Sequence, residues 1–197
     1  MKMQTIYSDL HLHSRFSFST SQRLTLDEIA KCARIKGLGL VGTADCLHGE
    51  WLQELEQGLS GGEKGFHYGE VGFLLQCEVE TAGRIHHLVF FPNFDACHSL
   101  RDWIKKKGLS KNIDTNGRPI LKLGGGEFKE AVLEIGGCLG PAHAFTPYTS
   151  LYSSYHSLED AYGGSTSGIS FLELGLSADT SMANGLRELR DLTFISS

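Results

Sequence analysis

The sequence predicts a mixed α/β protein in which strands and helices alternate around a barrel-like sheet. Strand-like residues 4–10 are followed by a helical segment at 25–36 and an apolar strand at 38–45. A strand, a helix and a second strand within about 40 residues form a βαβ unit, which implies parallel strands. The alternation continues along the chain, and most expected strands finish near a His, Asp or Glu. In barrels of this kind, functional side chains lie at the carboxyl ends of the strands.

The helix expected at residues 25–36 is defined by its apolar face and by its ends. Its apolar residues recur at helical spacing, at Leu26, Ile29, Ala30 and Ala33. Thr25 is a suitable N-cap with Glu28 three residues later, as in a capping box. Gly37 is a suitable residue to end the helix.

The remaining elements follow from short apolar runs and the breaks between them. Further strands are expected at 71–80, 84–91, 136–143, 169–176 and 191–197, and further helices at 51–59, 95–107, 127–135 and 181–189. Only three residues, including Gly83, separate the third and fourth strands, which predicts a hairpin. Glycine-rich residues 59–65 are expected to form a turn, and residues 144–168 a long loop. With no internal repeat, residues 1–197 are expected to form a single domain.

Composition and charge narrow the class of protein. No apolar run approaches the ~20 residues of a membrane span, and the N-terminus lacks the apolar run of a secretory signal. The five cysteines are odd in number and include no C-x-x-C pair, which argues against a disulfide framework and favours a reducing cytoplasm. The net charge of −5 argues against a compact basic nucleic-acid binder. Bound metal ions, however, supply positive charge that a side-chain count omits.

The ends of the expected strands carry residues that bind divalent metals. His11 and His13 are two residues apart on an extended segment, so both imidazoles point to the same face. The candidate ligands at the strand ends are His11, His13, Asp45, Glu78, one of the adjacent His86 and His87, and His143. Any one of these histidines could be an ordinary polar residue, but their shared placement at strand ends favours a metal site. Carboxylates such as these suit zinc, manganese or iron, and a carboxylate can bridge two ions.

The chemistry expected of such a site is metal-assisted hydrolysis. The chain has no nucleophile elbow, no phosphate-loop lysine and no dinucleotide fingerprint. Two or three ions about 3.5–4 Å apart would activate a water and stabilise charge on a phosphoryl group. Cys46 and Cys77 neighbour two of the candidate ligands but face the other way, so they are expected to pack in the core.

Further residues near the strand ends are expected to support the site or to contact a substrate. Asp9 shares the face of the two imidazoles and is expected to orient His11 rather than to bind metal. Arg15 either clamps a phosphate with two donors or is a solvated loop residue. His48 either binds metal, contacts substrate or is an exposed loop residue, and Glu173 lies on the strand at 169–176.

The segment DLHLHS at residues 9–14 resembles the opening H-x-H motif of the PHP (polymerase and histidinol phosphatase) superfamily. The order of metal ligands in that superfamily is matched here by His11, His13, Asp45, Glu78, His86 and His143. Longer stretches, among them IKGLGLVGTADCLHGEWLQEL and GPAHAFTPYTSLY, resemble its endonuclease Q branch across nearly the whole chain. The resemblance implies a distorted (β/α)7 TIM-like barrel with two or three divalent ions at the strand ends. Zinc is expected first, with manganese, magnesium or iron as alternatives, and the resemblance favours His86 over His87 as the ligand.

The resemblance also implies phosphoester hydrolysis, and in this branch the nicking of DNA on the 5′ side of uracil, hypoxanthine or abasic sites. Damaged DNA and, by family analogy, a DNA sliding clamp are the implied partners. The implied catalytic residues are His11, His13, Asp45, Glu78 and His143. Phe145 and Tyr148 either stack on an unpaired or flipped base or pack within their own loop. The alternatives are a phosphatase for a small phosphorylated metabolite, which the net charge favours, and a metal-binding remnant with little activity.

The sequence departs from the superfamily pattern in two places. Cys46 stands where the superfamily usually has a His directly after the Asp, and His48 lies two residues further on. The last metal motif, an Asp-x-His after a strand like 191–197, does not follow here. We therefore expect the domain to be C-terminally incomplete, with one metal position short of ligands and the activity of this chain alone reduced.

Overall fold

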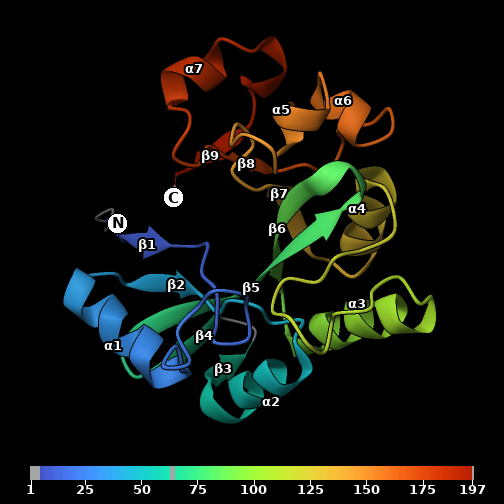
Figure 1. Cartoon of the computed structure of the whole chain (residues 1–197). Coiled ribbons are helices and arrows are strands. Elements are labelled where there is room, and N and C mark those ends of the chain that lie inside the picture. The colour runs from blue at the N-terminus through green and yellow to red at the C-terminus, as the bar shows by residue number, and fades with distance from the viewer. Residues whose placement is uncertain (1–4, 63–64, 197) are drawn as a thin grey trace.

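The computed structural model describes residues 5–62 and 65–196, which form a mixed α/β fold around a curled half-barrel of strands (Figure 1). The strands are β1 (Ser8–Asp9), β2 (Leu40–Gly42), β3 (Ser60–Gly62), β4 (Gly65–Tyr68), β5 (Val71–Thr81), β6 (Ile85–Phe91), β7 (Cys138–Pro141), β8 (Phe171–Glu173) and β9 (Thr193–Ile195). The α-helices are α1 (Leu26–Lys36), α2 (Gly49–Gly58), α3 (Phe94–Lys106), α4 (Gly125–Glu134), α5 (Leu151–Ser154), α6 (Leu158–Ala161) and α7 (Thr180–Asn184). Parts of three expected elements lie outside the described residues, namely Gln4, Glu63, Lys64 and Ser197.

The sheet begins as the βαβ pattern predicts and then changes direction. Strands β1, β2 and β5 are parallel neighbours. Beyond β5 the pairing becomes antiparallel, first to β6 and then to β7. A parallel bridge between Leu139 and Ile169 continues the path toward β8, which pairs with β9 in parallel. Within the described part of the chain, β1 and β9 end this path and are not paired with each other.

Helix α1 shows why the first half of the chain is predictable. The Thr25 side chain accepts a hydrogen bond from the Glu28 backbone N–H, and Gly37 ends the helix with φ of 72°, as expected. The expected apolar face is buried, at Leu26, Ile29, Ala30 and Ala33. Figure 1 shows α1, α2 and α3 around the β1–β5 part of the sheet, while α5, α6 and α7 gather with β8 and β9 at the opposite end.

The segment at residues 59–65, expected to be a turn, contains strand β3 and the first residue of β4, which pair antiparallel, while Glu63 and Lys64 between them lie outside the described residues. Its glycines predicted a turn, and Gly61 and Gly65 do hold φ values of 124° and 108° that favour glycine. The strand character comes from β4 pairing with the start of β5, a contact that local composition does not contain.

The second half of the chain differs more from expectation. The loop expected at residues 144–168 contains the short helices α5 and α6. The single helix expected at 181–189 is divided into α7 and a 3₁₀ turn at Arg187–Leu189. None of the helices in the described ranges combines the length and apolar character needed to cross a bilayer.

The core between the sheet and the helices buries Cys46 and Cys77 as predicted, and Cys97 with them. Cys46, Cys77 and Cys97 are fully buried, and the Sγ atoms of Cys97 and Cys46 lie 3.8 Å apart. Burial raises the pKa of all three thiols. These side chains therefore act as small apolar groups directly behind the strands that carry the candidate ligands.

Candidate metal centre

His11 and His13 follow the carboxyl end of β1 and both turn one ring nitrogen toward Glu78 on β5. Nε2 of His11 lies 3.6 Å from Oε1 of Glu78, and Nε2 of His13 lies 3.4 Å from Oε2. On the other side of each ring, Nδ1 of His11 lies 2.9 Å from Oε2 of Glu173, and Nδ1 of His13 lies 3.0 Å from Oδ1 of Asp45. A carboxylate on Nδ1 fixes the orientation of an imidazole and leaves Nε2 available for a metal.

The amide of Gln76 fixes the two segments that approach Glu78. Its Oε1 accepts hydrogen bonds from the backbone N–H of Leu12 at 3.3 Å and of Ala44 at 3.1 Å. A Cβ at Gly42 would lie 2.5 Å from the same oxygen, so the close approach requires glycine. The sequence placed Gln76 in a strand but gave no sign that its side chain joins the ends of two other strands.

The second half of the cluster comes from β6 and from the turn after β7. Nδ1 of His86 lies 2.8 Å from Oε1 of Glu78, and Nε2 of His143 lies 2.9 Å from the same oxygen. The register pairs Glu80 with His86, and directly paired residues share a face of the sheet. His86 therefore faces Glu78, while His87 faces the opposite side.

Asp45 and His143 both hold left-handed backbone conformations, with φ of 24° and 30°. Such values are uncommon for residues other than glycine and occur preferentially at functional sites. Each residue begins a tight turn, because His48 N donates to Asp45 O at 2.8 Å and Thr146 N donates to His143 O at 2.9 Å. Two different strand ends thus use the same kind of turn, which places the His143 side chain against Glu78 and the Asp45 side chain against His13.

Asp45 is buried behind His13 rather than among the other candidate ligand atoms. Its Oδ2 accepts hydrogen bonds from Ser14 N and Ser14 Oγ, both at 2.7 Å, and from Ser17 Oγ at 2.9 Å. Burial acts to raise the pKa of Asp45, but the contacts with His13 and Ser14 outweigh it and the pKa is lowered. Asp45 thus contacts Nδ1 of His13 from behind, and its assignment as a metal ligand stays a prediction.

Glu78 is the carboxylate that the four histidines of the cluster share. Only 1% of this residue is exposed, and burial acts to raise its pKa. The hydrogen bonds with His143 and His86 outweigh burial, so the pKa of Glu78 lies well below its usual range. Burial also disfavours the charged form of His11, yet the contact with Glu173 raises the pKa of His11. The site is a buried carboxylate surrounded by imidazoles.

The residues of the cluster fit divalent metal ions. His11, His13 and Glu78 form one group of potential ligand atoms and Glu78, His86 and His143 form another, each with its atoms within 4.8 Å of one another. Nε2 of His11 and Nδ1 of His143 are buried without a hydrogen-bond partner among the described residues. Buried ring nitrogens of this kind need a partner, which a metal would provide. Imidazole and carboxylate ligands suit zinc, manganese and iron, and Glu78 could bridge two ions.

A cavity of about 590 Å³ opens onto the cluster. It is lined by His11, His13, Glu78, His86, Arg118, His143, Thr146, Thr149, Gly175, Leu176 and Ser177. Sequence reasoning missed Arg118, which comes from the loop between α3 and α4. That loop has neither helical nor strand periodicity, so no local signal places Arg118 beside Glu78.

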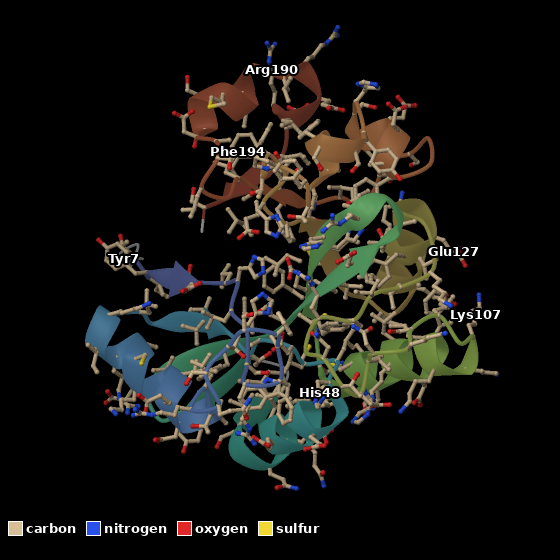
Figure 2. All side chains as sticks on the ribbon, in the orientation of Figure 1. Tyr7, His48, Lys107, Glu127, Arg190 and Phe194 are labelled. Carbon is tan, nitrogen blue, oxygen red and sulfur yellow. The ribbon has the colours of Figure 1, made fainter. Side chains whose placement is uncertain are left out.

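Arg15 and His48, which the sequence offered as possible site residues, contact other parts of the molecule. Arg15 forms an ion pair with Glu54 on α2, and its guanidinium lies 5.0 Å from the ring centre of Phe16. His48 is the N-cap residue of α2 and stacks on Phe16, with ring centres 4.1 Å apart. Figure 2 labels His48 beside α2. The structure thus brings Arg15 and His48 to α2 rather than to the cavity lining.

The remaining predicted residues are Asp9, which lies near His11, Phe145, which packs inside its loop, and Tyr148, which is exposed. Asp9 ends β1. Burial has the largest effect on the pKa of His11 and lowers it, whereas Glu173, Glu78 and, to a smaller extent, Asp9 raise it. Phe145 stacks on Tyr152 with ring centres 4.9 Å apart and packs against the core, which favours packing over base stacking. Tyr148 is 83% exposed and therefore remains available to a substrate.

The fold and the site together define a class, an α/β protein with a glutamate-centred histidine cluster at the strand ends. No protein-family model matches the chain. Among solved structures, the chain is similar to the lesion-specific endonuclease PfuEndoQ from Pyrococcus furiosus, with a TM-score of 0.92 and 42% identity over 98% of this chain and 47% of that one. It is equally similar to endonuclease Q in complex with a 27-mer duplex substrate with an abasic lesion at the active site, with a TM-score of 0.91 and 43% identity over 96% of this chain and 47% of that one. These matches confirm the predicted resemblance to the endonuclease Q branch over nearly the whole chain.

A curated relative extends the comparison to bacteria. The protein YqxK of Bacillus subtilis strain 168 is 34% identical over an alignment of 214 positions that covers 98% of this chain and 54% of that protein. The chain therefore spans about half the length of YqxK and of the two solved structures.

Proposed function

We propose that this chain carries the metal site of a metal-dependent phosphodiesterase that, as the intact protein, nicks DNA on the 5′ side of uracil, hypoxanthine or abasic sites. The observation that carries the proposal is Glu78, one carboxylate common to two groups of histidine ligands in a single cavity. The DNA substrate is carried over from the relative whose active site holds an abasic lesion. A sliding clamp as partner rests on resemblance alone.

The proposal extends to the architecture around the site. We propose that residues 1–197 form one metallo-phosphoesterase domain and that the half-barrel is part of a distorted (β/α)7 barrel of the PHP type. The parallel start of the sheet and the placement of the ligands after its strands support this assignment.

In this proposal, five side chains hold two or three divalent ions, with zinc first and manganese, magnesium or iron as alternatives. They are His11, His13, Glu78, His86 and His143. Bound ions would supply Lewis acidity and an activated water. Glu173 and Asp45 orient His11 and His13 through their Nδ1 atoms, which keeps both Nε2 atoms directed into the cluster. The loop after His143 faces the substrate, since Thr146 and Thr149 line the cavity and the exposed Tyr148 lies between them to stack on a base.

The proposal is tested by incubating the full-length protein with manganese, magnesium or zinc and duplexes that carry one uracil, hypoxanthine or abasic site. We expect a nick on the 5′ side of the lesion, none in an undamaged duplex, and none with Glu78→Gln. Release of inorganic phosphate from small phosphate esters, with the damaged duplexes left intact, would instead establish the phosphatase. Stoichiometric metal binding without either activity would identify a metal-binding remnant and overturn the proposal.

A further inference from the structure

Arg118 is held in place by the backbone of its own loop, residues 107–124. The segment after it runs alongside the end of β5, where Glu80 N donates to Pro119 O at 3.0 Å and Leu121 N donates to Glu80 O at 2.8 Å. On the other side, Asn112 Nδ2 donates to Arg118 O at 3.2 Å. The position of the Arg118 backbone is therefore fixed relative to the strand that carries Glu78.

The side chain of Arg118 crosses to the carboxylate at the centre of the cluster. Its Nη1 lies 3.3 Å from Oε2 of Glu78, and its Nη2 lies 3.7 Å from Oε2 of Glu80. The side chain is 37% exposed and lines the cavity, where it is the single Lys or Arg among the described lining residues. Nη1 also lies 3.4 Å from Nδ1 of His86. A planar guanidinium has five donors, more than these three atoms can satisfy. Donors are therefore left to face the cavity.

We infer that Arg118 binds the phosphate of the substrate and competes with the divalent ions for Glu78. Both roles follow from one geometry, because the same guanidinium contacts the shared carboxylate and faces the space where a phosphodiester would lie. When ions occupy the oxygens of Glu78, Arg118 loses that partner and its fork of donors is free for phosphate oxygens. The identity of the anion as a phosphodiester rests on the proposed function, whereas the competition for Glu78 does not.

A purely structural role is the alternative, in which Arg118 only holds its loop against β5. The chain offers a matched control, because Arg101 on α3 holds the same loop from outside the cavity. Arg101 forms an ion pair with Asp114 and its Nη1 donates to Leu47 O at 2.6 Å. If loop anchoring is the whole function of Arg118, loss of Arg101 should reproduce the effects of losing Arg118.

The experiment compares Arg118→Met, Arg118→Lys and Arg101→Met with the unaltered chain, using manganese alone and then inorganic phosphate on the manganese-loaded protein. Calorimetric titration measures both affinities without any DNA. In Arg118→Met we expect manganese to bind about two- to fivefold more tightly, since a partly screened competing cation is removed. Phosphate should bind about 10- to 100-fold more weakly, because charge-assisted hydrogen bonds are lost.

The two other variants keep the inference open to refutation. Arg118→Lys retains the positive charge but not the planar pair of N–H donors. Its phosphate affinity should therefore lie between that of the unaltered chain and that of Arg118→Met. The inference would be overturned if Arg118→Lys and Arg118→Met bind phosphate as tightly as the unaltered chain. It would also be overturned if Arg118→Met and Arg101→Met lose manganese and phosphate affinity to the same extent. If Arg118→Met does not fold, unchanged phosphate affinity in Arg118→Lys is sufficient to overturn it. Failure to nick DNA while these binding shifts are observed would contradict the proposed function and leave the role of Arg118 intact.

Discussion

The two faces of the β5–β6 ribbon both bury ionisable side chains, but one face carries a charged group and the other a neutral one. On one face, Glu78 and His86 are 1% and 3% exposed and contact each other at 2.8 Å. On the other face, His87 is fully buried and its ring nitrogens contact two hydroxyls, Thr81 Oγ1 at 2.8 Å and Tyr162 Oη at 2.9 Å. Glu78 and His87 are similarly buried, so burial alone does not decide whether each is charged.

The partners on each face decide the charge instead. Burial, helped by the nearby charge of His86, lowers the pKa of His87 to about 3, so its ring is neutral. A neutral imidazole offers one donor and one acceptor, which two hydroxyls can satisfy. Glu78 is equally removed from water, but its imidazole partners keep its pKa well below the usual range. A buried charge is tolerated only where it is paired, and the charged face is the one that opens on the cavity.

Glu78→Gln removes the central charge of the charged face, and we expect it to change metal affinity more than any other substitution proposed for the two faces. The substitution removes one carboxylate from both ligand groups at once, while the fold retains a side chain of the same size. We expect divalent metal affinity to fall by more than about 100-fold, beyond the loss that usually follows when a residue supporting a ligand is changed. Metal titration with a competing chelator measures the change. Retained stoichiometric binding would show that Glu78 is not the shared ligand.

The pair His86→Leu and His87→Leu tests whether the two faces act separately. His86→Leu should weaken metal binding by at least about tenfold and should also lower the free energy of unfolding, because the buried charge of Glu78 loses one of its partners. His87→Leu should leave metal affinity unchanged but lower the free energy of unfolding by about 1–3 kcal/mol for each stranded hydroxyl. Urea unfolding in the presence of a chelator and metal titration separate the two outcomes. A loss of metal affinity in His87→Leu would show that the faces are coupled.

The alternation of side chains predicted the two faces of β6 but not which of them carries the site, and only the resemblance favoured His86 over His87. Alternation places His86 and His87 on opposite sides of a strand, and a hairpin was expected where one exists. The choice between the two imidazoles depends on the register, which pairs Glu80 with His86, and on the curl of the sheet around Glu78. Register and curl arise from contacts between distant segments, so the residues alone leave both choices open.

The position of Arg118 and the β3–β4 hairpin could not be predicted from neighbouring residues in the sequence, because both depend on contacts with β5. Helix α1 was predictable because its caps and apolar spacing lie within the helix itself. Arg118 enters the cavity only because Pro119 and Leu121 attach their loop to Glu80. The glycine-rich hairpin likewise becomes β structure by pairing with β5. The assignment of site residues stays a prediction, although the structure brings five of the six predicted metal ligands together around Glu78 and places Asp45 behind His13.

Tyr162→Phe tests the neutral face with the smallest expected change in the free energy of unfolding. It removes the hydroxyl that contacts Nδ1 of His87 while keeping the buried ring, so one ring nitrogen loses its partner. We expect the free energy of unfolding to fall by about 1–2 kcal/mol, with metal affinity unchanged. Tyr148→Phe is the matched control and should be neutral in urea unfolding, since Tyr148 is 83% exposed. If Tyr162→Phe instead weakens metal binding and leaves stability unchanged, the network around His87 belongs to the metal centre, because only a coupled network would transmit that loss across the ribbon.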